Sequence, residues 1–274
     1  MEISWRFVWQ ENLYWASCEP CTAARFLTLV RDAQVCWKIG TRRAVIKAVR
    51  EGLPLEKWTC RSDYQQWRMM QLAKPRAGDK FALKPEPLRL LQWADELKTS
   101  LPGFIYAVSE FGLVPRLDKN GKPRLNADGT PMMYRRRSQQ NVLHLSGLFM
   151  SDYDHLPFSP QELYEKTQQK GCPWKTRLAH LTSSGEGLRL VSEWNREMGG
   201  NIADQQYLQA QELGMLNVVG TTGKHVTDNS CVNCDKFSFC PREEDILFID
   251  EDHLFSYIST LNPFNDLKNG TRHF

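Results

Sequence analysis

Two aspartates, Asp152 and Asp154, are the residues of this sequence that most directly suggest chemistry. They end an apolar run over residues 143–150, which is typical of a buried strand. Because side chains alternate across a strand, carboxylates at positions i and i+2 point to the same face. They repel each other unless a cation lies between them, and Mg²⁺ or Mn²⁺ prefers such oxygen ligands. The pair indicates a divalent metal site, although an Asp-x-Asp alone also occurs where a strand runs into a polar loop.

A serine- and glycine-rich turn before a second apolar strand is another candidate for ligand binding. Glycines let backbone N–H groups approach a ligand closely, and serine hydroxyls add donors. An arginine on the following strand can bind a phosphate through two hydrogen bonds. A tight β-turn without a ligand has the same composition. The residues that would contact a nucleotide are Ser183, Ser184, Gly185, Gly187 and Arg189.

A polar loop at residues 223–230 supplies a third candidate carboxylate, Asp228. Lys224 in the same loop would contact phosphates, and His225 would contact phosphates or a metal. By itself the loop is ordinary, and its interest comes from its place after the two preceding elements.

Three cysteines follow this loop. Cys231 and Cys234 form a C-x2-C pair and Cys240 lies close behind, a spacing that suits tetrahedral zinc. The fourth ligand would be His225 or Cys172. Three thiols beside a core strand explain the pattern equally well, so both interpretations stay open. A second C-x2-C pair at residues 18–21 has no nearby partner and is not expected to bind metal.

The composition limits the possible classes of protein. The 274 residues allow one large domain or two smaller ones, and 41% hydrophobic and 24% charged residues are typical of a soluble globular protein. There is no apolar run of membrane-spanning length and no signal-peptide pattern, so we expect a cytoplasmic protein that does not enter membranes. In that compartment the eight cysteines would be thiols or metal ligands. The net charge of +3 permits nucleic-acid binding without establishing it.

The elements that would position these residues fall into two halves. Apolar residues recur at helical spacing over residues 23–30, 41–50 and about 85–99. We therefore expect residues 1–98 to form a helical accessory domain, with most of its tryptophans packed between helices.

After residue 98 the pattern changes to short strands. Two hairpin-type signals, Asn120-Gly121 and Asp128-Gly129, predict a projecting β-ribbon. The ribbon is basic, and a nucleic-acid backbone or plain solvent would suit its charges. Its candidate nucleic-acid contacts are Lys122, Arg124, Arg135, Arg136 and Arg137.

Further along the chain, strands and helices alternate. Residues 159–162 predict a capped helix start, residues 204–213 another helix and residues 245–250 a last strand. This interleaving predicts an α+β catalytic domain over residues 99–274.

Taken in order, these elements resemble the archaeo-eukaryotic primase superfamily. That family carries an acidic Asp-x-Asp strand, a serine-rich turn with a basic residue on the next strand, and a final acidic residue. The likeness is closest to the primase domain of Bacteroidetes mobile elements and to CRISPR-associated primase-polymerases. The matching segments are residues 101–102, 146–156, 183–189, 228–239 and 254–255. Two positions depart from the family pattern, since Arg189 replaces histidine and Lys236 replaces arginine, and both keep a positive charge.

The resemblance implies an α+β primase-polymerase core with an RRM-like mixed sheet. It implies a DNA primase or polymerase that starts or extends primers on single-stranded DNA by two-metal nucleotidyl transfer. Asp152, Asp154 and Asp228 would hold two Mg²⁺ or Mn²⁺ ions, while Ser184 and Arg189 would hold the triphosphate of an NTP or dNTP. The nucleic acid would be contacted by Lys236 together with Arg135, Arg136 and Arg137. A helicase, or other replication or CRISPR proteins, would be partners.

Two other functions fit parts of the pattern. A primase-like chain without catalysis would only bind single strands or a replication origin, and three acidic residues kept in order argue against it. A glycosyltransferase would use Asp-x-Asp to hold a sugar nucleotide. That class carries a nucleotide-binding α/β half before the motif, whereas this sequence has a helical, tryptophan-rich half there.

Overall fold

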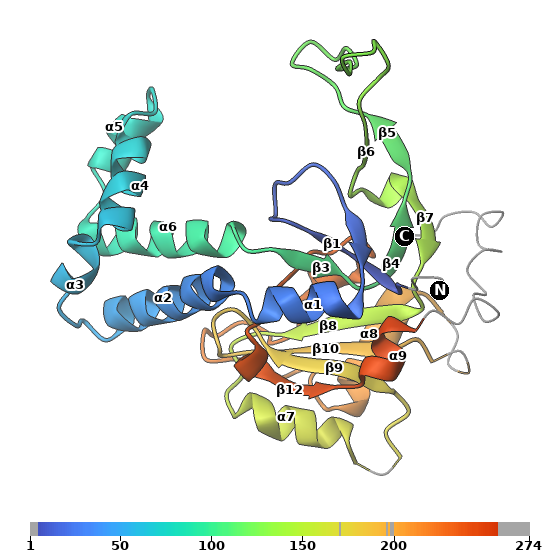
Figure 1. Ribbon diagram of the computed structural model, residues 1–274. Helices are drawn as coiled ribbons and strands as arrows, with labels where there is room; N and C mark the ends of the chain where they lie inside the picture. Colours follow the sequence, from blue (N-terminus) through green and yellow to red (C-terminus); the bar gives the residue numbers. More distant parts are fainter. Residues whose placement is uncertain (1–4, 170, 196, 198–199, 257–274) are drawn as a thin grey trace.

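Two four-stranded sheets share one core in the computed structural model, and a helical arm and a β-ribbon project from them (Figure 1). The structure describes residues 5–169, 171–195, 197 and 200–256. The expected α+β class is confirmed. The expected mixed sheet is not seen, because every strand pair in the described residues is antiparallel.

The first sheet contains strands from early and late parts of the sequence and has the order β11-β3-β1-β2. Its strands are β1 (Phe7–Gln10), β2 (Glu19–Cys21), β3 (Gly103–Ile105) and β11 (Ser238–Phe239). β1 pairs with β3, so the residues before Ala23 belong to the sheet of the later half. The region expected to be helical from residue 1 therefore begins with α1 (Ala23–Val30).

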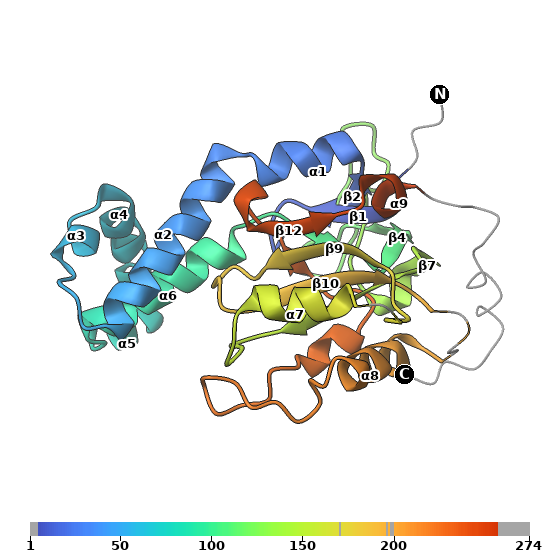
Figure 2. The ribbon, with the colours of Figure 1, turned by 90° about the horizontal axis from the view of Figure 1, so that it is seen from below.

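The second sheet has the order β12-β9-β10-β8 and carries the predicted acidic strand. Its strands are β8 (Leu148–Tyr153), β9 (Thr176–Leu181), β10 (Leu188–Glu193) and β12 (Ile246–Ile249). One face packs against α7 (Pro160–Thr167) and α8 (Ile202–Glu212), and the other faces α1 and α9 (Glu251–Phe255) (Figures 1 and 2). The predicted helices and last strand are therefore present, and Ser159 caps α7 in a capping box as expected.

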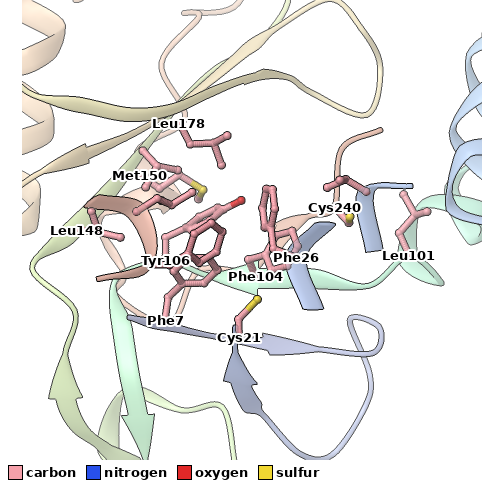
Figure 3. Close-up of a cluster of buried hydrophobic side chains, with 14 of the residues drawn as sticks. Phe7, Cys21, Phe26, Leu101, Phe104, Tyr106, Leu148, Met150, Leu178 and Cys240 are labelled. Atoms are coloured by element: carbon pink, nitrogen blue, oxygen red, sulfur yellow. The ribbon is translucent and has the colours of Figure 1, made fainter. Parts of the chain in front are cut away.

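Aromatic side chains fill the core that the two sheets share (Figure 3). The rings of Phe26 and Phe104 have centroids 4.9 Å apart, and those of Phe7 and Tyr106 are also 4.9 Å apart. Leu178 of the second sheet is fully buried in the same cluster. Because these side chains come from β1, α1, β3 and β9, the core joins segments that lie far apart in the sequence.

The helical arm has a core of its own. Its helices are α2 (Ala33–Arg50), α3 (Glu56–Thr59), α4 (Ser62–Leu72), α5 (Ala77–Ala82) and α6 (Glu86–Thr99). Trp58, Trp67 and Trp93 are buried among them, as expected for packing tryptophans. α2 and α6 pack along each other, and they carry the arm away from the sheets (Figure 1).

The predicted β-ribbon is also present. β4 (Val108–Phe111) pairs with β7 (Val142–Leu145), and β5 (Leu113–Pro115) pairs with β6 (Met133–Arg135). The segment between β5 and β6, residues 116–132, projects from the molecule (Figure 1). Gly121 and Gly129 have φ values of +77° and +82°, the left-handed conformation that such turn signals predict.

Replacing Phe104 with alanine should lower the free energy of unfolding by about 3–5 kcal/mol, because the ring is fully buried and leaves a cavity. Chemical denaturation monitored by circular dichroism measures this change. Leu83→Ala is the matched control, because Leu83 is 86% exposed and should change stability by less than about 0.5 kcal/mol. Equal stabilities of the two variants would contradict the shared core.

Candidate metal and nucleotide site

Two of the three predicted carboxylates meet at the end of β8. The backbone N–H of Asp228 donates to the carbonyl oxygen of Asp152 at 3.0 Å, and that of Asp154 donates to the carbonyl oxygen of Val226 at 2.8 Å. These bonds hold the loop of Asp228 alongside the acidic strand. One oxygen of Asp152, one of Asp228 and the thiol sulfur of Cys231 lie within 4.8 Å of one another. This group is the place in the described residues where side chains could hold a metal ion.

Asp154 lies on the same face as Asp152 but is not part of that close group. Both line one cleft, while Tyr153 between them is buried in the core on the opposite face. The alternation predicted for the strand is therefore confirmed. Cys231 takes the third place instead, and burial raises the pKa of its thiol to about 12. Hard cations prefer oxygen ligands to sulfur, so the two carboxylates would provide most of the attraction for Mg²⁺ or Mn²⁺.

The zinc site that the cysteine spacing left open is not assembled among the described residues. His225, Cys231, Cys234 and Cys240 do not gather their ligand atoms, and Cys172 does not complete a set. Cys234 packs with Phe237 in one core cluster and Cys240 lies in another. Burial raises the pKa of Cys234 to about 11 and that of Cys240 well above its usual value. The alternative interpretation, thiols beside a core strand, matches the structure.

Arg189 forms a buried ion pair with Asp152. The two residues lie directly opposite each other on β10 and β8, and a guanidinium nitrogen contacts one carboxylate oxygen. A second nitrogen donates to the hydroxyl of Ser238 at 3.0 Å. Burial raises the pKa of Asp152, and the charge of Arg189 opposes this shift. The guanidinium of Arg189, which was expected to bind phosphate, therefore neutralises the charge of Asp152 in this structure.

The other oxygen of Asp152 has no hydrogen-bond partner, although it is buried. Unpaired buried carboxylate oxygens are costly, and a metal ion would satisfy this one. The donor set therefore fits a divalent cation.

Lys236 neutralises Asp228 in a similar way. Its ammonium donates to one carboxylate oxygen at 2.9 Å, and Ser230 donates to the other through its backbone N–H at 2.8 Å and its hydroxyl at 2.6 Å. Burial raises the pKa of Asp228, but these hydrogen bonds outweigh it and hold the pKa below its usual value. Asp228 is therefore an ionised carboxylate at neutral pH. Lys236, predicted to contact nucleic acid, lies beside the acidic group.

A cleft of about 150 Å³ lies over these residues and gathers much of the predicted nucleotide site. Its wall includes Ser183 and Ser184 from the predicted turn, but Lys224 is not part of it and lies exposed in the neighbouring loop. Sequence analysis did not single out several of its other residues. The cleft is lined by Arg42, Lys98, Asp152, Asp154, His155, Thr182, Ser183, Ser184, Arg189, Asp228, Lys236, Phe237 and Phe239.

Arg43 from α2 fixes the serine-rich turn. Its guanidinium donates to the carbonyl oxygens of Thr182 at 2.9 Å and Ser183 at 3.3 Å, and it forms two hydrogen bonds with Asp245 at 2.8 and 3.0 Å. The helical segment expected to be accessory therefore positions this wall of the cleft. The sequence signal that could have indicated this role was the pair of adjacent arginines at residues 42–43 in the predicted helix.

The two glycines of the turn allow close packing. Gly185 has a φ of +81°, and a Cβ atom there would lie 3.1 Å from a nitrogen of Arg43. At Gly187 a Cβ atom would lie 2.5 Å from the carbonyl oxygen of Tyr153 and 2.9 Å from a carboxylate oxygen of Asp154. A side chain at Gly187 would therefore displace Asp154 from the cleft.

The three predicted arginines at the end of the ribbon, which was expected over residues 116–137, have different surroundings. Arg136 is exposed, and Arg135 is half-buried. Arg137 donates to the carbonyl oxygen of Leu13 at 3.3 Å, and its guanidinium lies 5.0 Å from the centre of the Phe237 ring. Arg137 therefore supports the fold, which leaves Arg136 as the most accessible of the three.

Comparison with known proteins adds no assignment, because no family model, curated protein or solved structure matches the chain. In the described ranges, no helix combines the length and the apolar composition needed to cross a membrane. Function must be inferred from the residues of the cleft and from the motifs that place them there.

His180 extends the polar row of Asp152 and Arg189 onto β9. Its Nδ1 lies 2.8 Å from the carbonyl oxygen of Leu181, and its Nε2 is buried without a partner. Burial, helped by the charge of Arg189, lowers the pKa of His180 to about 3. The ring is therefore neutral, with a proton on Nδ1.

This lowered pKa predicts a loss of stability in acid. An unfolded histidine takes up a proton as the pH falls below about 6.5, whereas folded His180 does not until about pH 3. The free energy of unfolding should therefore fall by up to about 1.4 kcal/mol per pH unit across that range. His180→Gln should show a shallower fall between about pH 6 and pH 4.5 in urea denaturation. Equal slopes for the native protein and the variant would contradict the buried neutral ring.

Proposed function

We propose that this chain is a nucleotidyltransferase of the primase-polymerase type, acting on a single-stranded DNA template with NTPs or dNTPs. The observation that carries the proposal is the approach of the Asp152 and Asp228 oxygens to within 4.8 Å of each other. The serine-rich turn and several cations line the same cleft, and these elements follow one another along the sequence in the order typical of the primase superfamily. Two carboxylates placed so close together do not contribute to packing the two sheets.

Divalent ions held by Asp152 and Asp228 would neutralise the triphosphate and lower the pKa of the attacking 3′-hydroxyl. Asp154 would face the same cleft and add negative charge to attract them. Other residues that line the cleft would hold and orient the nucleotide. Ser183 and Ser184 are among them, and a cation that binds Asp152 would leave the guanidinium of Arg189 available for a phosphate oxygen.

A second candidate function is binding without catalysis. Arg189 and Lys236 already neutralise Asp152 and Asp228, so the acidic pair is partly satisfied by the chain itself. A primase-like module that only grips single strands would suit that arrangement. Incorporation of nucleotides separates the two functions.

Asp228→Asn and Asp152→Asn should abolish primer synthesis, because each removes a charged metal ligand while keeping side-chain volume. The measurement is the formation of labelled oligonucleotides from NTPs or dNTPs on single-stranded DNA with Mg²⁺ or Mn²⁺. Asp252→Asn is the control, since Asp252 is exposed on α9 away from the cleft.

Circular dichroism should confirm that each variant is folded, because Asp152→Asn leaves Arg189 buried without its ion-pair partner. An active Asp228→Asn enzyme would refute the metal assignment. A native protein that binds template but makes no product would favour the binding module.

The ribbon should contribute to template binding through charge alone. Changing Lys122, Arg124 and Arg136, all exposed, to glutamine should weaken binding of single-stranded DNA. The slope of log affinity against log salt should become shallower by about 0.7 for each phosphate that the variant no longer neutralises. Fluorescence anisotropy at several salt concentrations measures this. The control changes three exposed lysines of the arm, Lys47, Lys74 and Lys80, and an equal effect there would contradict a specific role for the ribbon.

A further inference from the structure

Arg42 is a buried cation with unmet hydrogen-bonding capacity. It lies on α2, lines the cleft and is only 8% exposed. Two of its guanidinium nitrogens, Nε and Nη1, are buried without any hydrogen-bond partner. The third lies 3.9 Å from Asp95, whose side chain is 73% exposed. The neighbouring Arg43, by contrast, makes four hydrogen bonds to Asp245 and the serine-rich turn.

Lys98 on α6 adds a second cation to the same wall. Its ammonium lies 5.0 Å from the centre of the Phe239 ring, and among the described residues it has no ion pair with a carboxylate. Burial lowers its pKa, and the charges of Arg42 and Arg189 lower it further. Arg42 and Arg189 therefore both repel the charge of Lys98.

The carboxylates of the cleft balance this charge only in part. Asp152 is paired with Arg189 and Asp228 with Lys236, which leaves the charge of Asp154 to act on both Arg42 and Lys98. A guanidinium taken out of water without a partner is unfavourable, so an anion from outside the chain would stabilise it. A phosphate suits the planar fork of arginine, because two of its oxygens can accept parallel hydrogen bonds.

We propose that Arg42 and Lys98 form a phosphate-binding site in the cleft, which takes the polyphosphate of a nucleotide. The site is built by α2 and α6, outside the strands and turn that carry the acidic residues. That the bound polyphosphate belongs to a nucleotide rests on the proposed nucleotidyl transfer. That the site binds a polyphosphate at all is independent of the proposed function. The arm would then be part of the binding site.

Inorganic tripolyphosphate, without metal or DNA, tests the site directly. Isothermal titration calorimetry should detect its binding to the native chain, and Arg42→Gln and Lys98→Gln should each weaken that binding by about tenfold or more. Lys47→Gln is the matched control, because Lys47 is exposed on the same helix. It should bind tripolyphosphate as the native chain does.

Thermal unfolding of the ligand-free proteins separates a binding role from a structural one. Arg42→Gln removes a buried charge whose ion pair, to the exposed Asp95 at 3.9 Å, is weak, so its midpoint of unfolding should equal or exceed that of the native chain. If Arg42 served the fold through Asp95, the variant would unfold at a lower temperature. A less stable Arg42→Gln protein that still binds tripolyphosphate would overturn the proposal.

The outcomes also separate this site from the proposed function. No binding of tripolyphosphate to the native chain, or unchanged binding to both variants, overturns the site whatever the primer assay gives. Primer synthesis by Arg42→Gln with an unchanged KM for the nucleotide overturns the site and leaves the function standing. Loss of tripolyphosphate binding in both variants, with no primer synthesis by the native chain, supports the site and removes the function.

Discussion

The buried ion pair between Asp152 and Arg189 constrains the whole site. Two buried charges are tolerated here because each neutralises the other, although one oxygen of Asp152 and the Nε of Arg189 have no hydrogen-bond partner. The antiparallel register of β8 and β10 sets the two residues opposite each other, and Ser238 of the first sheet supplies another partner. Any cation that binds Asp152 must compete with this guanidinium. Metal binding and the position of Arg189 are therefore coupled.

The sequence predicts that Asp152 and Asp154 point to the same face, because the alternation of side chains along a strand depends only on neighbouring residues. The turns at Gly121 and Gly129 and the helix cap at Ser159 were equally predictable, since a few neighbouring residues decide them. Asp228 was placed with Asp152 only by the family resemblance, and their side chains lie close together in the structure. The ion pair of Arg189 was not predictable, because it depends on which strands pair and in which register.

Cysteine spacing misled for a related physical reason. A C-x2-C pair brings two thiols near each other along the chain but does not say which way each one points. Here Cys231 and Cys240 belong to one apolar cluster and Cys234 to another, and of the three only the thiol of Cys231 lies near the two carboxylates. Strand β1 was missed because its pairing with β3 spans more than eighty residues, and β2 pairs in turn with β1. Helical periodicity also treats charged positions as solvated, which hid Arg42 and Arg43.

α2 shows why the arm cannot be treated as separate from the sheets. Its first half places Val35 and Ile39 in the shared core, and its second half places Val45 in the core of the arm. Arg42 and Arg43 lie between these halves, where the helix passes the cleft. A rigid helix anchored in both cores holds its charged residues in fixed positions. A boundary at residue 98 would also separate Lys98 from the Phe239 ring that it contacts. The cleft therefore depends on contacts that cross the boundary the sequence suggested.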